Sequence, residues 1–216
     1  MKGDVIVLER HHIEAGECIA AAIIEKITAA GRRYIITVSG ESGSGKSETA
    51  KAIADALEKE GILSVILGQD DYFVLPPISN DRKRREDSDW LGPHVEVQME
   101  LLNSHIAAAL SGEDAVKKPL MNYMEDCATE EEVCLAGVQV VIAEGTYTAL
   151  LRQVDCRVFI DRNRLDTLEH RRKRNRGSEV GDPFIEDVLK TEHKIIAGHR
   201  FLADVIISKD YAVSFV

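Results

Sequence analysis

Residues 34–47 read Tyr34-Ile-Ile-Thr-Val-Ser-Gly-Glu-Ser-Gly-Ser-Gly-Lys-Ser47, and this stretch decides the fold. Residues 34–38 form a short apolar run rich in β-branched side chains, as expected of a buried strand. Gly40 to Ser47 then follow the spacing G-x-x-x-x-G-K-[ST], and the alanine-rich residues 45–60 predict a helix. A strand, a glycine-rich turn and a helix in this order predict a phosphate-binding loop.

The residue types in this loop suit the binding of a nucleoside triphosphate. Glycines let the backbone turn tightly enough for its N–H groups to face phosphate oxygens, and the helix adds its positive N-terminal end. We expect Lys46 to reach the β- and γ-phosphates and Ser47 to bind Mg²⁺. The alternative is a merely flexible glycine–serine turn. The predicted nucleotide-binding residues are Gly40, Glu41, Ser42, Gly43, Ser44, Gly45, Lys46, Ser47 and Thr49.

Further apolar runs predict strands that alternate with helical segments. These strands lie at residues 63–67, 138–143, 157–160 and 203–207, and a helix is predicted at residues 95–110. Nearly continuous apolar runs are typical of parallel strands that are buried on both faces. We therefore predict an α/β fold for residues 32–216, a P-loop three-layer sandwich with about five parallel strands flanked by helices.

Residues 1–31 precede this unit as an N-terminal annex. Residues 5–8 predict a strand, and residues 14–30 predict a helix because isoleucines recur at helical spacing. We expect this annex to pack on the same domain, and the sequence assigns it no function. The segment from Pro76 to Asp89 shows no clear periodicity, and we interpret it as a loop over the site.

Composition excludes several classes of protein. The 216 residues carry a net charge of -10, which argues against the broad basic surface of a nucleic-acid binder. The four cysteines are too scattered for a disulfide scaffold or a paired metal site, and no apolar run is long enough to span a bilayer. We expect a soluble, cytoplasmic protein without a nucleic-acid or membrane partner, for which a homo-oligomer stays open.

Acidic residues directly follow two of the predicted strands. Asp70 and Asp71 come after residues 63–67, and Glu144 comes after residues 138–143. Because ligands gather at the carboxyl ends of parallel strands, we assign Asp70 as the base that takes the proton of an acceptor hydroxyl. The expected metal ligands are Ser47, Glu144 and Asp70. The alternative is that Asp70 and Asp71 cap a turn and Glu144 is a solvated strand end.

A cluster of cations interrupts the acidic sequence at residues 161–177. Arg171 and Arg174 are three residues apart, so they share one face of a predicted helix. Such a pair can close over the phosphates as a helical lid, and Arg174 is the better candidate to stabilise charge on the transferring group. A solvated face that pairs with neighbouring carboxylates is the alternative.

These motifs together resemble the uridine kinase and phosphoribulokinase family of P-loop kinases, from about Tyr34 to Ile207. The resemblance rests on the phosphate loop and on Gln69-Asp-Asp-Tyr-Phe73, Ala143-Glu-Gly-Thr-Tyr147, Arg171-Arg-Lys-Arg174 and Ala203-Asp-Val-Ile-Ile207. It implies a five-stranded parallel sheet with a mobile lid. It also implies that Asp70 is the catalytic aspartate, Glu144 the magnesium-associated glutamate, and Arg171 and Arg174 the lid arginines.

The residues expected near the acceptor depart from the uridine kinase pattern. Where uridine kinases carry an aspartate that grips the ribose hydroxyls, Asp89-Trp-Leu-Gly-Pro93 places Leu91, and this stretch looks closer to phosphoribulokinases. Phe73 falls where uridine kinases have a tyrosine near the sugar. Trp90 and Tyr123 complete the candidate acceptor contacts, although each is equally consistent with ordinary packing.

The motif series predicts an ATP- and Mg²⁺-dependent kinase that phosphorylates a nucleoside such as uridine or cytidine, with Asp70, Lys46 and Arg174 as catalytic residues. A sugar phosphate or another anionic metabolite is the alternative acceptor, favoured by Leu91 and by the basic residues 82–85. From another class, the chain could be a nucleotide-binding regulatory module without acceptor chemistry. The intact phosphate loop and carboxylates argue against that alternative.

Overall fold

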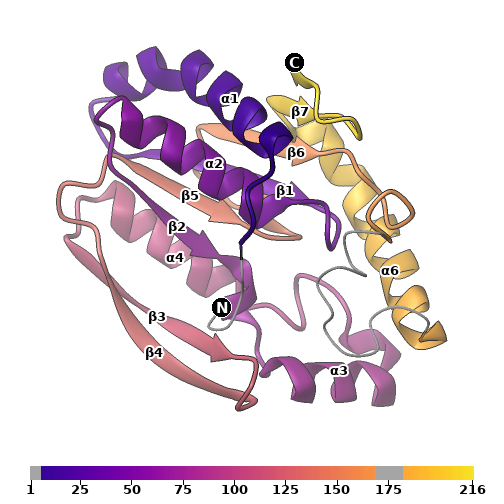
Figure 1. Ribbon diagram of the computed structural model, residues 1–216. Coiled ribbons are helices and arrows are strands. Elements are labelled where there is room, and N and C mark those ends of the chain that lie inside the picture. Colours follow the sequence, from indigo (N-terminus) through magenta and orange to yellow (C-terminus); the bar gives the residue numbers. More distant parts are fainter. Residues whose placement is uncertain (1–5, 169–181) are drawn as a thin grey trace.

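The computed structural model describes residues 6–168 and 182–216 (Figure 1). Its centre is a six-stranded sheet in the order β2-β5-β1-β6-β7-β8. The pairs from β2 to β7 are parallel, and β8 is antiparallel to β7, so the predicted α/β fold is confirmed. The strands are β1 (Tyr34–Gly40), β2 (Ser64–Gly68), β5 (Val140–Glu144), β6 (Cys156–Ile160), β7 (Val205–Ile207) and β8 (Val213–Phe215).

Helices cover both faces of this sheet. Helices α1 (Arg10–Ala29) and α2 (Lys46–Lys59) lie on one face, and α4 (Met99–Leu110) and the end of α6 (Pro183–Ile196) pack on the other. Ile36 of β1 packs with the first pair, and its neighbour Ile35 packs with the second. All of β1 is therefore buried, which explains why it reads as a continuous apolar run.

The annex is a helix without the predicted strand. Helix α1 packs along α2, and a Cβ on Gly16 would lie only 2.6 Å from the carbonyl carbon of Ala52. Residues 6–8 form no strand, so the prediction for residues 5–8 is wrong over its described part. Ile6 and Val7 are exposed, because these residues pair with no strand that could bury them.

The segment from Pro76 to Asp89 is not a loop, which corrects the sequence interpretation. It forms α3 (Pro77–Glu86) and the short 3-10 helix η2 (Ser88–Trp90). Only Asn80 of α3 is buried, so this helix has no apolar stripe that a sequence pattern can reveal. Ion pairs one turn apart support it instead, from Arg85 to Asp81 at 2.9 Å and from Lys83 to Asp87 at 3.1 Å.

A hairpin of β3 (Ala115–Asn122) and β4 (Cys127–Cys134) was also missed by the sequence analysis. Strand β4 is largely solvent-exposed and carries three consecutive glutamates, so it lacks the alternation of a half-buried strand. Among the described residues, no helix is both long and apolar enough to cross a membrane. The remaining elements are the 3-10 helices η1 (Gln69–Tyr72), η3 (Thr148–Leu150) and η4 (Ala197–Leu202).

Candidate active site

The phosphate loop joins β1 to α2 in the tight conformation that its glycines allow. Gly45 directly precedes α2 and has a φ of 97°. The Ser44 N–H donates to the Glu41 carbonyl at 3.1 Å, which closes the turn. Lys46 Nζ donates to the same carbonyl at 2.9 Å, so the lysine folds back over the loop. The loop therefore places a cation beside backbone N–H groups at the start of a helix, as an anion site requires.

Two hydroxyls of this region have no hydrogen-bond partner within the described protein. Ser44 Oγ and Thr49 Oγ1 are both buried without one. Buried hydroxyls normally make at least one hydrogen bond. These two hydroxyls and the folded-back Lys46 therefore indicate that the loop binds a polar ligand.

Glu144 lies at the carboxyl edge of the sheet, between β1 and β2. It pairs in register with Val38 of β1 and Gly68 of β2, and a Cβ on Gly68 would lie 3.2 Å from Glu144 Oε1. Burial raises the pKa of Glu144 to about 7, and the neighbouring Asp70 carboxylate adds to this effect. Lys46 and a hydrogen bond with Ser47 act in the opposite direction. The structure thus gathers Lys46, Ser47, Asp70 and Glu144 from three separate sequence motifs.

In the metal-free protein, we expect Glu144 to lower stability as the pH rises from about 4.5 to about 7. Its folded pKa of about 7 lies above the ordinary value of 4.5, so the folded state binds more protons in this window. The contribution of protonated Glu144 to the free energy of unfolding is therefore fully present below about pH 4.5 and is lost as the pH rises to about 7. At 1.36 kcal/mol per pKa unit, the change reaches about 3 kcal/mol at most.

Chemical unfolding of wild type and Glu144→Gln in EDTA, at a series of pH values, measures this contribution. The stability of wild type relative to the variant should fall across the window, since glutamine cannot titrate. A stability difference that stays constant with pH would show that Glu144 titrates normally.

Asp70 and Asp71 occupy different environments at the end of β2. Asp71 is buried, and its carboxylate accepts from Lys118 Nζ at 2.6 Å and from the Met121 N–H at 3.0 Å. These bonds fasten η1 to the β3–β4 hairpin. Asp70 is half-exposed beside Glu144. Sequence reasoning missed Lys118, whose only signal is a lysine at an inward position of a strand.

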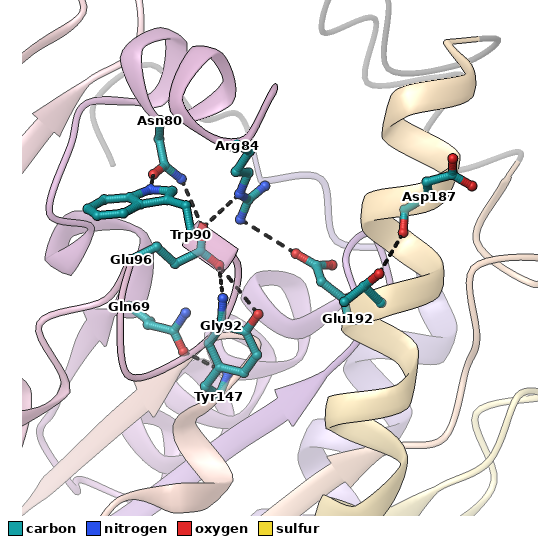
Figure 2. A network of polar contacts seen from close by, with 10 residues as sticks. Gln69, Asn80, Arg84, Trp90, Gly92, Glu96, Tyr147, Asp187 and Glu192 are labelled. Atoms are coloured by element: carbon teal, nitrogen blue, oxygen red, sulfur yellow. Dashed lines mark hydrogen bonds and ion pairs between the residues drawn. The ribbon is translucent and has the colours of Figure 1, made fainter. Parts of the chain in front are cut away.

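A buried polar network lies beside this edge, and Figure 2 shows it around Glu96. Glu96 has no exposed surface, and it accepts from Arg84 Nε at 2.7 Å, Asn80 Nδ2 at 3.1 Å and the Gly92 N–H at 3.1 Å. Arg84 also lies 3.7 Å from Glu192 of α6. This network, which sequence analysis did not identify, joins α3, α6 and the residues after η2.

Two of the predicted acceptor residues, Phe73 and Trp90, lie beside the Glu96 network. The Arg84 guanidinium lies 5.8 Å from the ring centre of Phe73, and Trp90 Nε1 donates to Asn80 at 2.7 Å, so both flank the Glu96 network. Tyr123 is half-buried in the turn of the β3–β4 hairpin, and this turn contacts the start of α3, where Asp126 accepts from the Ser79 hydroxyl at 2.7 Å. Trp90 is thus tied to α3 by its polar edge.

A cavity of about 500 Å³ opens next to this network. Leu91 lines it with Gly92 and Pro93, the stretch where the sequence departs from uridine kinases. Ile195 and His199 close it from α6 and η4, and the remaining lining residues are Asp89, His94, Val95 and Leu150. The departure therefore places an apolar side chain in a cavity wall.

The lid arginines Arg171 and Arg174 lie outside the described residues. Cations just before them are described, and Arg164 Nη1 lies 3.3 Å from Glu186 of α6. Arg162 donates to the Tyr211 hydroxyl at 3.3 Å. The described residues before position 169 thus contact both α6 and the turn before β8.

Comparisons with known proteins agree with this geometry. A model described as the Phosphoribulokinase / Uridine kinase family matches residues 35–181. A bifunctional alpha-galactosidase/sucrose kinase from Mediterraneibacter gnavus is 30% identical over 195 residues, which cover 85% of this chain and 21% of that protein. A uridine kinase from Shewanella pealeana is 33% identical over 134 residues, which cover 59% of this chain and 62% of that protein. The matches thus span less than two thirds of both relatives.

The structure of a possible uridine kinase from Bacillus stearothermophilus is also similar, with a TM-score of 0.62. The two chains are 20% identical, and the match covers 89% of this chain and 97% of the other. At this identity, the likeness concerns the fold alone.

Proposed function

This chain belongs to the phosphoribulokinase and uridine kinase family, and from that premise we propose that it transfers the γ-phosphoryl group of ATP to a hydroxyl group of a small molecule. The observation that carries the proposal is the meeting of Lys46, Ser47, Asp70 and Glu144 beside the phosphate loop. A cation, a hydroxyl and two carboxylates are the groups that phosphoryl transfer with Mg²⁺ requires.

The residues take separate roles in this proposal. Asp70 accepts the proton of the acceptor hydroxyl as its oxygen bonds to the γ-phosphorus, while the bond from that phosphorus to the β–γ bridging oxygen breaks and ADP leaves. Lys46 and the loop N–H groups stabilise the negative charge on the phosphate oxygens. Arg171 and Arg174 stay proposed lid cations.

The residues present also fit a magnesium ion. Ser47, Glu144 and Asp70 supply only oxygen atoms, which are the ligands that Mg²⁺ prefers. Burial and the nearby Asp70 carboxylate favour the neutral form of Glu144, which is why its pKa is raised, and a bound cation would favour the ionised form instead. When bound, the ion supplies positive charge to the transferring phosphates.

We further propose a neutral, hydroxyl-rich acceptor. An anionic acceptor needs unpaired cations, and the basic residues of α3 favoured that alternative in the sequence. In the structure, Arg84 pairs with Glu96, Arg85 with Asp81 and Asp182, and Lys83 with Asp87. Three of the four basic residues 82–85 are thus committed to carboxylates of the same chain, and the fourth, Arg82, lies near Asp126. This pairing argues against an anion subsite on α3.

Two neutral acceptors remain as candidates. A nucleoside follows from the motif series and from the similarity to a uridine kinase. A carbohydrate is favoured by the similarity, over 85% of this chain, to a bifunctional enzyme with a sucrose kinase. Leu91 also favours the carbohydrate, because it removes the carboxylate that uridine kinases aim at ribose.

The test is ADP release from ATP and Mg²⁺ across nucleosides, mono- and disaccharides, and pentose phosphates. Turnover with a neutral sugar or nucleoside supports the proposal, and the better of the two identifies the class. Turnover only with a pentose phosphate would overturn the neutral acceptor. Tight ATP binding without turnover on any acceptor, and no response to Asp70→Asn, would favour the regulatory module.

A further inference from the structure

Tyr211 reaches the phosphate loop from the turn between β7 and β8. Its hydroxyl donates to the carbonyl oxygen of Ser44 at 2.9 Å. The same hydroxyl contacts His12 Nε2 at 3.0 Å and accepts from Arg162 Nη1 at 3.3 Å. One phenol therefore joins the annex, the segment after β6 and the backbone of the phosphate loop.

The hydrogen bonds of His12 give this contact a direction. The Glu9 N–H donates to His12 Nδ1 at 3.1 Å, so Nδ1 carries no proton and Nε2 is the donor. His12 Nε2–H therefore faces the Tyr211 oxygen at 3.0 Å and His11 Nε2 at 3.2 Å, and the shorter contact makes Tyr211 its main acceptor. The Tyr211 O–H in turn donates to Ser44. His12 is only 2% exposed and Ser44 has no exposed surface, so both ends of this chain of hydrogen bonds are buried, with the half-buried Tyr211 between them.

The fit against the loop is close. A Cβ on Gly45 would lie 2.0 Å from the Tyr211 hydroxyl oxygen and 3.1 Å from His12 Nε2. Tyr211 itself holds a φ of 63°, which is uncommon for a tyrosine and strains its backbone. The turn enforces this conformation, since the Tyr211 N–H donates to the Ser208 carbonyl at 2.9 Å. The strained backbone of Tyr211 thus places its hydroxyl against the Ser44 carbonyl of the loop.

We propose that Tyr211 and His12 are positioning residues that hold the Ser44–Gly45 backbone in its phosphate-binding conformation. Fixing the Ser44 carbonyl fixes the peptide plane that follows it, and therefore the N–H of Gly45. The family match starts at residue 35, so the annex lies before it. The annex would then contribute to donor binding through α1. The inference rests on the proposed function only in taking this loop as the phosphate site.

The first test is Tyr211→Phe, which removes one oxygen atom. We expect the dissociation constant for ATP with Mg²⁺ to rise about five- to thirtyfold, as for one buried hydrogen bond. The KM of the acceptor should stay unchanged. Tyr34→Phe is the matched control, because that hydroxyl contacts Asp155 at 3.4 Å near the opposite end of β1 and should leave ATP binding as in wild type.

A second measurement separates loop positioning from contact with the nucleobase. Calorimetry with tripolyphosphate in place of ATP should show the same loss of affinity in Tyr211→Phe, since only phosphates are then bound. Weakened ATP binding with unchanged tripolyphosphate binding would overturn the proposal, because Tyr211 would then act on the base. Unchanged binding of both ligands would also overturn it.

Variants of His12 provide a second test, which holds even if Tyr211→Phe does not fold. His12→Leu should weaken tripolyphosphate binding, and His12→Gln, which keeps a donor near the position of Nε2, should recover part of it. In the Tyr211→Phe background, His12→Leu should add little, because both act through one hydroxyl. Additive losses would contradict the chain of hydrogen bonds. Wild type that binds tripolyphosphate but phosphorylates no acceptor would instead contradict the proposed function and leave this inference standing.

Discussion

Asp70→Asn is expected to lower kcat by about a hundred- to ten-thousandfold while ATP binding stays within a few fold of wild type. Asparagine keeps the shape of the side chain but cannot take a proton from the acceptor hydroxyl. Asp70 is half-exposed and is not tied to the hairpin as Asp71 is, so the fold should tolerate the change. Steady-state kinetics and calorimetric ATP binding on the same preparation measure both quantities.

The adjacent Asp71→Asn provides the contrast. It removes the charge that pairs with Lys118 inside the protein, so we expect the free energy of unfolding to fall by about 3–5 kcal/mol. Glu131, at 2.7 Å from the same lysine, should limit the loss. If Asp71→Asn lowered kcat at full stability and Asp70→Asn did not, the base would be assigned to the wrong carboxylate.

Gly45→Ala is expected to weaken ATP binding by about a hundredfold or more. The new methyl group would lie 2.0 Å from the Tyr211 hydroxyl, and the φ of 97° is a conformation that alanine rarely adopts. The loop must therefore move away from its phosphate-binding shape, at a cost of several kcal/mol. Calorimetric titration with ATP and Mg²⁺ gives the affinity, and thermal unfolding shows whether the fold persists.

Gly61→Ala is the matched control for this substitution. Gly61 also has a positive φ, of 75°, but no atom lies within 4 Å of an added Cβ. It should lower stability by about 1 kcal/mol through backbone strain alone and leave ATP binding unchanged. In the Tyr211→Phe background, Gly45→Ala should lose less affinity than it does in wild type, because the closest clashing atom is gone. Equal losses in both backgrounds would place the cause in the backbone rather than in the contact.

The sequence by itself determined the features that depend on neighbouring residues. Buried parallel strands need apolar side chains on both faces, so residues 34–38 and the later apolar runs were recognisable, and the sheet is confirmed. A phosphate loop is built from consecutive residues, so one short motif is enough to predict it. The family also followed from motif order, and the match over residues 35–181 confirms it. Helix α3 was not predicted, because ion pairs rather than an apolar stripe support it.

Only the tertiary structure decided which distant residues meet. Glu96, Arg84 and Glu192 come from three segments, and nothing in their local sequence shows that a shared, water-poor interior pairs their charges. The same holds for Lys118 with Asp71, and for Tyr211 and His12, which are 199 positions apart but share one hydrogen bond. Local sequence patterns encode strands, turns and helices. Buried polar groups from distant segments pair with one another because an unpaired charge or hydroxyl inside the protein costs free energy.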